Sequence, residues 1–287
     1  MTSRDGGYLA VDIGGTKLAV GIVSAEGELL SSASTPTPQV DVWESLVRLI
    51  DERLRDAPIE VSCCGVGCGG PMGPGGESVS TLHIPEWRNF PLHSSLATHL
   101  GMPTFIANDA QAIVLGESWV GALRGESNAI GMVVSTGVGG GVISDSRLVL
   151  GRLGNAGHIG HMIVEPEGRW CACGARGCLE AHASGTAIRE MTGRPAAEAP
   201  IEIRRQTGRY VGRALASVGA LFDLRRAVIG GSVALGFGAP FFEGVDEELQ
   251  LRCGLEFLHD FVVTPVGLGS SSPLIGAAAV ARAATSV

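Results

Sequence analysis

The sequence predicts an α/β protein built from two lobes of similar plan. At 287 residues, the chain is longer than one typical domain. Each half opens on two β-rich segments joined by a polar, glycine-rich turn, at residues 14–17 and 136–140. Segments with a helical spacing of apolar residues follow in both halves. This repetition predicts two lobes with a nucleotide cleft between them and a boundary near Asn108 and Asp109.

The first part of the chain, up to residue 119, is expected to form an antiparallel meander, two further strands and two helices. The strand segments are short, apolar and rich in β-branched residues, whereas the helical segments repeat apolar residues every three or four positions. Asp109 is placed to cap the second helix. The predicted strands are 8–13, 18–23, 28–32, 59–66 and 104–107, and the predicted helices are 42–54 and 109–119.

The same two periodicities predict the elements of the second half of the chain. Its expected strands are 129–135, 141–144, 227–229 and 261–264, and the expected helices are 203–222, 240–253 and 274–284. We expect residues 1–108 to form the N-terminal α/β lobe, completed by the C-terminal helix at about 274–287. Residues 109–273 are expected to form the C-terminal α/β lobe.

Composition and charge argue against several classes of protein. The formal net charge is -8 and no cluster of Lys and Arg occurs, so a nucleic-acid partner is not expected. No run of about twenty apolar residues is present, so no membrane span is expected. Residues 1–7 are short and polar for a secretory signal, and the cysteines suit a reducing compartment. We therefore expect a cytoplasmic protein.

Three strand-to-turn junctions carry the residue types that bind phosphates. Around Asp12, Thr16 and Lys17, glycine N–H groups, a hydroxyl and an ammonium group can meet phosphate oxygens, while the carboxylate can hold Mg²⁺ through water. Each junction alone also fits a hairpin turn that tolerates glycine, but two similar turns in similar hairpins favour phosphate binding. The residues predicted to bind the nucleotide are Asp12, Gly14, Gly15, Thr16, Lys17, Thr136, Gly137, Gly230 and Gly231.

Residues 65–70 match the dinucleotide pattern G-x-G-x-x-G after a predicted strand. That motif must open a helix, whereas Pro71, Pro74 and two glycines follow here. We therefore reject a dinucleotide site and interpret this segment, including Gly70, as a loop that lines the pocket.

The most specific pattern in the chain predicts a zinc site. His161, Cys171, Cys173 and Cys178 supply three thiolates and one imidazole, the donor set of a closed tetrahedral Zn²⁺ site with a structural role. Reduced core cysteines are the alternative, but these three cysteines are separated by Gly and Arg, which core cysteines rarely are. The other cysteines are expected to be buried apolar residues (Cys63, Cys64, Cys68 and Cys253), and four histidines are expected at the surface or satisfied in the core (His83, His93, His99 and His182).

With these motifs in place, the chain resembles the ROK family of sugar kinases nearly end to end. The resemblance covers residues 12–17, 108–109, 136–141, 157–161, 171–180 and 229–232. It implies the two-lobe hexokinase/actin-like (ribonuclease H-like) fold, with a nucleotide and sugar cleft between the lobes. It also implies transfer of the ATP γ-phosphoryl group to a hexose hydroxyl, usually O6, with Mg²⁺, and a homodimer.

Matching positions imply roles for individual residues. Asp109 would be the general base, although an Asp at a helix start is by itself more typical of a cap. Asn108 and Glu180 would bind the sugar, and His161 would bind zinc through one ring nitrogen and a sugar hydroxyl through the other. Zinc would then hold the loop that directs His161 and Glu180, so loss of the metal should weaken sugar binding.

The chain departs from the glucokinase-like pattern at His158, where such members usually carry a glutamate. The resulting run resembles bacterial N-acetylmannosamine kinases, so we favour an N-acylated hexose such as N-acetylmannosamine, with glucose as the alternative. The segment 190–206 is also shorter than in the family. A sugar-sensing transcriptional regulator of the same family is a rival from another class, but its helix-turn-helix segment would precede Tyr8. ATP and polyphosphate both remain open as phosphate donors.

Overall fold

The computed structural model describes residues 6–81 and 84–285, and its chain divides into two compact units. The first unit contains the chain up to Arg124, the segment Leu150–Ala156 and the chain from Gly267 onwards. The second unit contains Gly125–Val149 and Gly157–Val266. Each unit has its own five-stranded mixed sheet and its own apolar core.

The sheet of the first unit has the strand order β3-β2-β1-β4-β5. The first three strands form an antiparallel meander, because the turn between β1 and β2 is short enough to close a hairpin. Strands β4 and β5 continue the sheet parallel to β1. The strands are β1 Gly7–Ile13, β2 Lys17–Val23, β3 Leu29–Pro36, β4 Val61–Cys68 and β5 Thr104–Asn108.

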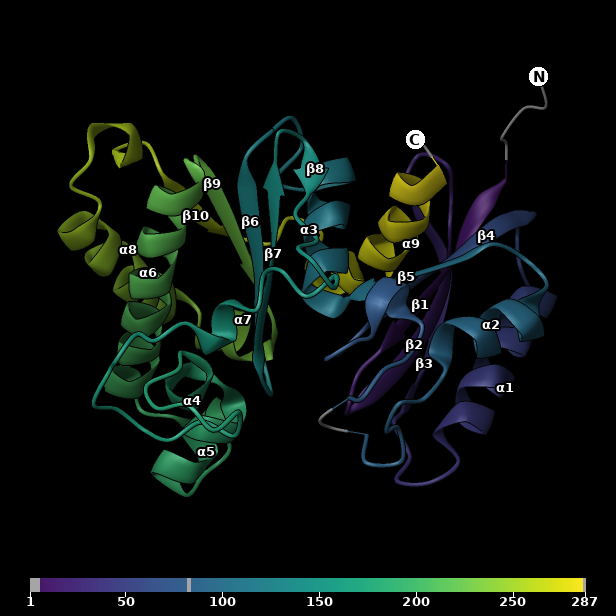
Figure 1. The fold of residues 1–287 in the computed structure, drawn as a ribbon, viewed down its shortest axis with the longest axis horizontal. Coiled ribbons are helices and arrows are strands. Elements are labelled where there is room, and N and C mark those ends of the chain that lie inside the picture. Colours follow the sequence, from purple (N-terminus) through teal and green to yellow (C-terminus); the bar gives the residue numbers. More distant parts are fainter. Residues whose placement is uncertain (1–5, 82–83, 286–287) are drawn as a thin grey trace. The chain divides into compact units, whose positions relative to one another are not determined.

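Helices cover both faces of this sheet (Figure 1). Helices α1 (Val42–Arg55) and α2 (Leu92–Leu100) bury their apolar residues against Leu9 and its alternate neighbours. Helices α3 (Asp109–Val120) and α9 (Ser272–Thr285) lie against the opposite face. Because side chains alternate along a strand, Asp12 belongs to the same face as Ala10, which contacts α9.

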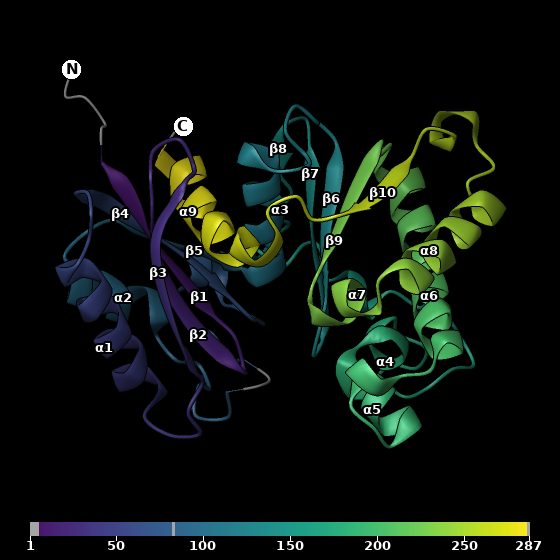
Figure 2. The same cartoon turned by 180° about the vertical axis from the view of Figure 1, so that it is seen from behind.

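The sheet of the second unit has the order β10-β9-β6-β7-β8 (Figure 2). Helices α6 and α8 pack closely on each other. A Cβ at Gly208 would lie 2.0 Å from the Phe241 carbonyl oxygen, so only glycine fits at this position. The strands are β6 Ala129–Val134, β7 Val138–Ser144, β8 Arg147–Leu148, β9 Arg226–Gly230 and β10 Val262–Pro265. The helices are α4 Glu180–Ala183, α5 Gly185–Thr192, α6 Ile201–Phe222, α7 Ser232–Phe237 and α8 Ala239–Arg252.

The division between the units falls after Arg124, later than the boundary expected at Asn108. Helix α3 belongs to the first unit because it packs directly on α9. A Cβ at Gly116 would lie 2.8 Å from the backbone of Gly276, so the two helices approach through a pair of glycines. The spacing of apolar residues could not reveal this contact, since it joins segments 160 positions apart in sequence.

Glu117 joins two segments of the first unit, one near Ala122 and one that begins at Gly267. Its side chain is fully buried, and its carboxylate accepts hydrogen bonds from the amides of Ala122, Gly267 and Leu268 and from the Ser272 hydroxyl at 2.9–3.1 Å. A buried carboxylate with four donors is well solvated by the protein. This contact therefore ties the end of α3 to the start of α9.

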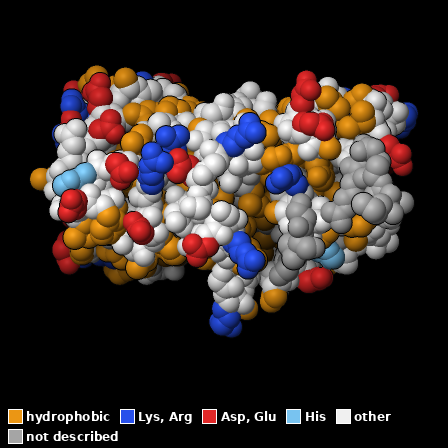
Figure 3. Space-filling model, turned by 90° about the horizontal axis from the view of Figure 1, so that it is seen from above, with side chains coloured by type: hydrophobic (Ala, Val, Ile, Leu, Met, Phe, Trp, Pro, Cys, Tyr) orange, Lys and Arg blue, Asp and Glu red, His pale blue; other side chains and the backbone are white. Residues whose placement is uncertain are grey.

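Among the described residues, no helix is both long and apolar enough to cross a membrane. On the face shown in Figure 3, basic side chains are interspersed with acidic ones and do not gather into one patch.

Candidate active site and metal centre

Two carboxylates lie close together in the first unit. Asp12 is near the end of β1, and Asp109 is the first residue of α3, directly after β5. Strand β4 runs between β1 and β5, and a Cβ at its Gly67 would lie 3.8 Å from both Asp109 Cα and Asp12 Oδ1. The pKa of Asp12 is raised from 3.8 to about 7, mainly by burial and in part by the Asp109 carboxylate, against the opposing effect of Lys17. Asp12 and Asp109 thus lie close together, and the pKa of Asp12 is raised, as is typical of functional sites.

Asn108, and not Asp109, occupies the N-cap position of α3. Its side-chain oxygen accepts the Ala110 amide at 3.1 Å, and its own amide N–H donates to Gln111 at 3.3 Å, which completes a capping box. Asp109 Oδ1 also accepts the Ala110 amide, at 2.9 Å. The cap fixes the backbone from which both candidate residues project.

Gln111 is a supporting residue that sequence reasoning missed. Its side-chain amide donates to the carbonyl oxygens of Gly154 and Ala156 at 3.1 and 2.9 Å. The segment Leu150–Ala156 is thereby held against the start of α3, within the first unit. The S/T/N-x-x-E/Q capping pattern was the available signal, since Gln111 follows Asn108 by three positions.

The turn at residues 14–17 links β1 to β2 beside Asp12. The Gly14 amide donates to the Lys17 carbonyl at 3.0 Å, and the Thr37 hydroxyl donates to the Gly14 carbonyl at 2.6 Å. The Gly14 amide is therefore already hydrogen-bonded inside the turn. Gly15, Thr16 and Lys17 are left as the candidates for phosphate contacts here. Thr16 and Lys17 are exposed, as a ligand contact requires.

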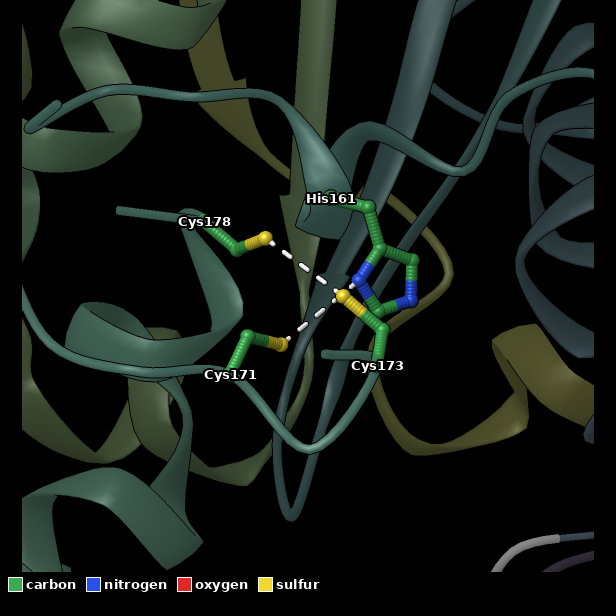
Figure 4. A group of neighbouring side chains, drawn as sticks. All are labelled: His161, Cys171, Cys173 and Cys178. Carbon is green, nitrogen blue, oxygen red and sulfur yellow. Dashed lines mark hydrogen bonds between the residues drawn. The ribbon is translucent and has the colours of Figure 1, made fainter. Parts of the chain in front are cut away.

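In the second unit, the four predicted zinc ligands come together (Figure 4). Their ligand atoms all lie within 4.8 Å of one another, with His161 Nδ1 3.8 Å from Cys171 Sγ and Cys173 Sγ 3.7 Å from Cys178 Sγ. Zn–S bonds of about 2.3 Å in a tetrahedron place sulfur atoms about 3.8 Å apart. The donor set and its spacing therefore fit Zn²⁺. All described cysteines are free thiols.

Tight backbone turns bring the three cysteines together. Gly174 and Gly177 adopt φ values of +91° and +85°, which residues with a Cβ rarely tolerate. A Cβ at Gly177 would also lie 2.0 Å from the Glu165 carbonyl oxygen. Arg176 closes the loop by donating to Glu167 and to the Gly168 carbonyl. The glycines between the cysteines are thus required by the loop itself.

His161 directs Nδ1 toward the thiols, so Nε2 is the ring nitrogen on the other side (Figure 4). His158 lies one 3₁₀ turn before it, and the two rings stack with centroids 6.1 Å apart and an interplanar angle of 22°. Both side chains are half-buried. This arrangement places two imidazoles side by side next to the metal centre.

Glu180 begins α4, two residues after Cys178. Its Oε2 accepts the Val138 amide at 2.8 Å. A Cβ at Gly137 would lie only 2.9 Å from this oxygen, so glycine is needed where the turn passes the carboxylate. Glu180 therefore contacts the predicted phosphate turn as well as lying next to the zinc loop.

The three-glycine run after Gly137 lies within β7, not in the turn as expected. The turn is only Ser135 to Gly137, because Ser135 N–H donates to the Gly137 carbonyl and β7 begins at Val138. Gly140 permits a close approach instead: a Cβ there would lie 2.9 Å from Ile159 Cγ2 and 3.1 Å from the Gly157 carbonyl oxygen. The glycines let the 157–161 segment lie directly on the strand.

The third glycine junction follows β9. Gly231 has φ +96°, and a Cβ there would lie 2.3 Å from the Val134 carbonyl oxygen. Ser135 and Ser232 approach each other here through their hydroxyls at 3.0 Å. The close approach to Val134 is therefore enough to require glycine at position 231, whether or not a nucleotide binds there. Gly70 follows β4 in a loop, and the next long helix, α2, begins only at Leu92, which agrees with rejection of a dinucleotide motif.

The remaining histidines and cysteines have structural surroundings. His182 is buried, accepts the Arg169 amide at 3.2 Å and stacks on Tyr210, and burial lowers its pKa. His93 and His99 have hydrogen-bonding partners, and His83 lies outside the described residues. The predicted burial is confirmed for Cys63, Cys64 and Cys68 but not for Cys253, which is only partly covered.

The candidate residues are divided between the two units. The first unit holds the possible base, one sugar ligand and one phosphate turn: Gly70, Asn108, Asp109, Asp12 and residues 14–17. The second unit holds the metal centre, the other predicted sugar ligands and two glycine junctions: His158, His161, Glu180, Cys171, Cys173, Cys178, Thr136, Gly137, Gly230 and Gly231.

Comparisons with known proteins cover nearly the whole chain. The family model described as the ROK family matches residues 8–284. A glucokinase from Thermotoga maritima is 40% identical over 186 residues, which are 64% of this chain but less than two thirds (59%) of that enzyme. An N-acetylmannosamine kinase from Haemophilus influenzae is 32% identical over 286 residues, which cover 94% of this chain and 93% of that enzyme. The crystal structure of a ROK family glucokinase from Streptomyces griseus, in complex with glucose and AMPPNP, superposes with a TM-score of 0.82 at 30% identity, covering 97% of this chain and 100% of that chain.

Proposed function

The chain belongs to the ROK family of sugar kinases, and we propose that it transfers the γ-phosphoryl group of ATP to the 6-hydroxyl of a hexose. The observation that carries this proposal is the pairing of Asp109 with Asp12 beside a turn whose Thr16 and Lys17 are exposed. Phosphoryl transfer to an alcohol needs a proton acceptor and a means of neutralising phosphate charge. These residues supply both kinds of group within one unit.

In the proposed reaction, Asp109 accepts the proton of the 6-hydroxyl as the sugar oxygen bonds to the γ-phosphorus. The bond from that phosphorus to the bridging β,γ-oxygen breaks, and ADP leaves with the electron pair. Lys17 and the backbone amides of the turn hold the phosphates. Mg²⁺, when bound, neutralises phosphate charge, and Asp12 would hold it through water.

We propose that Asn108, His158, His161 and Glu180 hold the sugar hydroxyls, with Gly70 lining the sugar pocket. The side-chain amide nitrogen of Asn108 is not used in the helix cap, and His161 Nε2 lies on the side of the ring away from the thiols. Zinc held by His161, Cys171, Cys173 and Cys178 would fix the orientation of that ring. The proposed role of the metal is structural.

Replacement of Asp109 by Asn tests the assignment of the base. The amide cannot accept the hydroxyl proton, so kcat for ATP-dependent hexose phosphorylation should fall by about 10²–10⁴-fold. Coupled ADP release measures the rate, and thermal melting checks the fold. Thr37→Val serves as a control, because it removes a hydrogen bond to the nearby 14–17 turn without removing a carboxylate. Undiminished turnover in Asp109→Asn would show that another group is the base.

We propose an N-acylated hexose such as N-acetylmannosamine as the preferred substrate, with glucose as the alternative. His158, stacked beside His161, replaces the expected carboxylate, and an imidazole offers a donor or an acceptor where a carboxylate only accepts. The relatives include kinases named for each sugar. We expect kcat/KM to be higher for N-acetylmannosamine than for glucose; a large preference for glucose would contradict this assignment.

We further propose a cytoplasmic homodimer that uses ATP as phosphate donor. A reducing compartment keeps the three thiols in the form that binds zinc. Comparing ATP with polyphosphate in the same assay identifies the donor, and light scattering measures the oligomeric state.

A further inference from the structure

The contact between Glu180 and the Ser135–Gly137 turn has a consequence for nucleotide binding, which rests on the function proposed above. The turn carries Thr136 and Gly137, the predicted phosphate contacts of the second unit. We propose that Glu180 is a positioning residue for this turn, so that the zinc-bearing segment sets the affinity for the nucleotide as well as for the sugar.

The first observation is that the zinc-bearing segment bounds the turn on two sides. Glu180 Oε2 accepts the Val138 N–H at 2.8 Å, a charge-assisted hydrogen bond to the residue that ends the turn. On the carbonyl side of the same residue, a Cβ at Gly160 would lie 2.2 Å from the Val138 oxygen. Val138 is thus held between Glu180 and the residue that precedes His161.

The second observation is that the segment after Glu180 fastens the rest of the turn. The Gly185 amide donates to the Ser135 carbonyl at 2.7 Å, and the Thr186 hydroxyl donates to the Thr136 carbonyl at 3.0 Å. These bonds come from the start of α5, five residues after Glu180. The turn therefore takes its conformation from the segment that carries the metal ligands, and Glu180 is the charged member of these contacts.

The third observation is the lack of space between the two groups. Gly137 passes so close to the carboxylate that a Cβ there would lie 2.9 Å from Glu180 Oε2. A side chain at position 137 would displace Glu180, and a displaced Glu180 would release Val138. The contact between Glu180 and the turn can therefore be perturbed by a substitution at position 180 or at position 137. Because coupling between two binding sites is reciprocal, either substitution should affect both nucleotide and sugar binding.

The test measures the binding of each ligand alone to the full-length, zinc-loaded protein. By titration calorimetry without sugar, Glu180→Ala should weaken binding of a non-hydrolysable ATP analogue about tenfold, since a charge-assisted hydrogen bond is lost. Glu180→Gln should restore most of this affinity, because the amide oxygen can still accept the Val138 N–H. In the converse experiment, Gly137→Ala should weaken hexose binding without nucleotide.

Asn108→Ser is the matched control, because serine retains a capping oxygen for α3 while the side-chain amide is lost. It should weaken sugar binding and leave affinity for the ATP analogue unchanged. If Glu180→Ala binds the analogue like the wild type, or if Gly137→Ala changes nucleotide binding alone, Glu180 is a sugar ligand only and the inference is wrong. Should Glu180→Ala fail to fold, the Gly137→Ala titration decides. A wild type that binds no nucleotide would instead overturn the proposed function.

Discussion

At the scale of single residues, Asp12 shows how the fold alters an ordinary carboxyl group. Burial, followed by the nearby Asp109 carboxylate, raises its pKa from 3.8 to about 7. In the folded protein the proton is therefore retained at pH values where the unfolded chain has lost it. Between about pH 4 and 7, the free energy of unfolding should fall as the pH rises, and above this range the full penalty applies.

Replacement of Asp12 by Asn should remove that penalty. In the absence of Mg²⁺ and nucleotide, Asp12→Asn is expected to be more stable than the wild type at pH 8, by up to roughly 4 kcal/mol at about 1.4 kcal/mol for each pKa unit. The difference should shrink toward zero near pH 4. Urea unfolding at several pH values measures it, and kinase activity should be lost. A difference that does not change with pH would show that Asp12 is ionised throughout.

At the scale of elements, the end of α3 depends on a single buried side chain. Glu117 accepts four hydrogen bonds, three of which join α3 to residues 267–272 at the start of α9. Three of the donors are backbone amides, which substitutions of their own side chains would leave in place. Their partner can be removed only by changing Glu117 itself.

Glu117→Ala should therefore be severely destabilising. Loss of the carboxylate leaves one buried donor and three part-buried donors without this acceptor, at a combined cost of at least about 3 kcal/mol in the free energy of unfolding. Ser272→Ala is the control: it removes one donor and leaves the carboxylate three others, so it should cost at most about 1.5 kcal/mol. Urea denaturation of both variants measures the difference. Similar costs for the two would mean that these hydrogen bonds contribute little.

At the scale of the whole molecule, the chain forms two units with separate cores. The Cys/His cluster belongs entirely to the second unit, where the loop around it is held mainly by polar contacts such as those of Arg176. Apart from Cys171, Cys178 and Ala181, little apolar surface is buried at the zinc loop itself. We therefore expect this segment to depend on the metal for its order.

Removal of zinc should affect the second unit and spare the first. After treatment with a strong chelator, limited proteolysis is expected to cut within residues 162–179 while the segment up to Arg124 stays protected. Thermal melting should shift downward, and added Zn²⁺ should restore it. Cys171→Ser should reproduce the chelator's effect in untreated protein, whereas Cys253→Ser, outside the cluster, should not. Cleavage in the first unit at the same rate would contradict this division of stability.

Short-range patterns in the sequence were enough to predict the Cys/His cluster, the principal strands and the long helices. Cysteine spacing, alternation of apolar residues and capping residues act over a few positions, so they can be read without knowledge of the fold. The ligand atoms of His161, Cys171, Cys173 and Cys178 do come together, as predicted. Two of the segments that resemble the family, residues 157–161 and 171–180, contain these four ligands.

Other features depended on contacts between distant segments, and only the tertiary structure decided them. Helix α3 belongs to the first unit because Gly116 meets Gly276, and glycine at position 140 of β7 is favoured by the approach of Gly157 and Ile159. Glu180 reaches a turn 42 positions earlier in the sequence. No local pattern encodes such pairs, because the physical cause is the fit of two surfaces that exist only once the chain has folded.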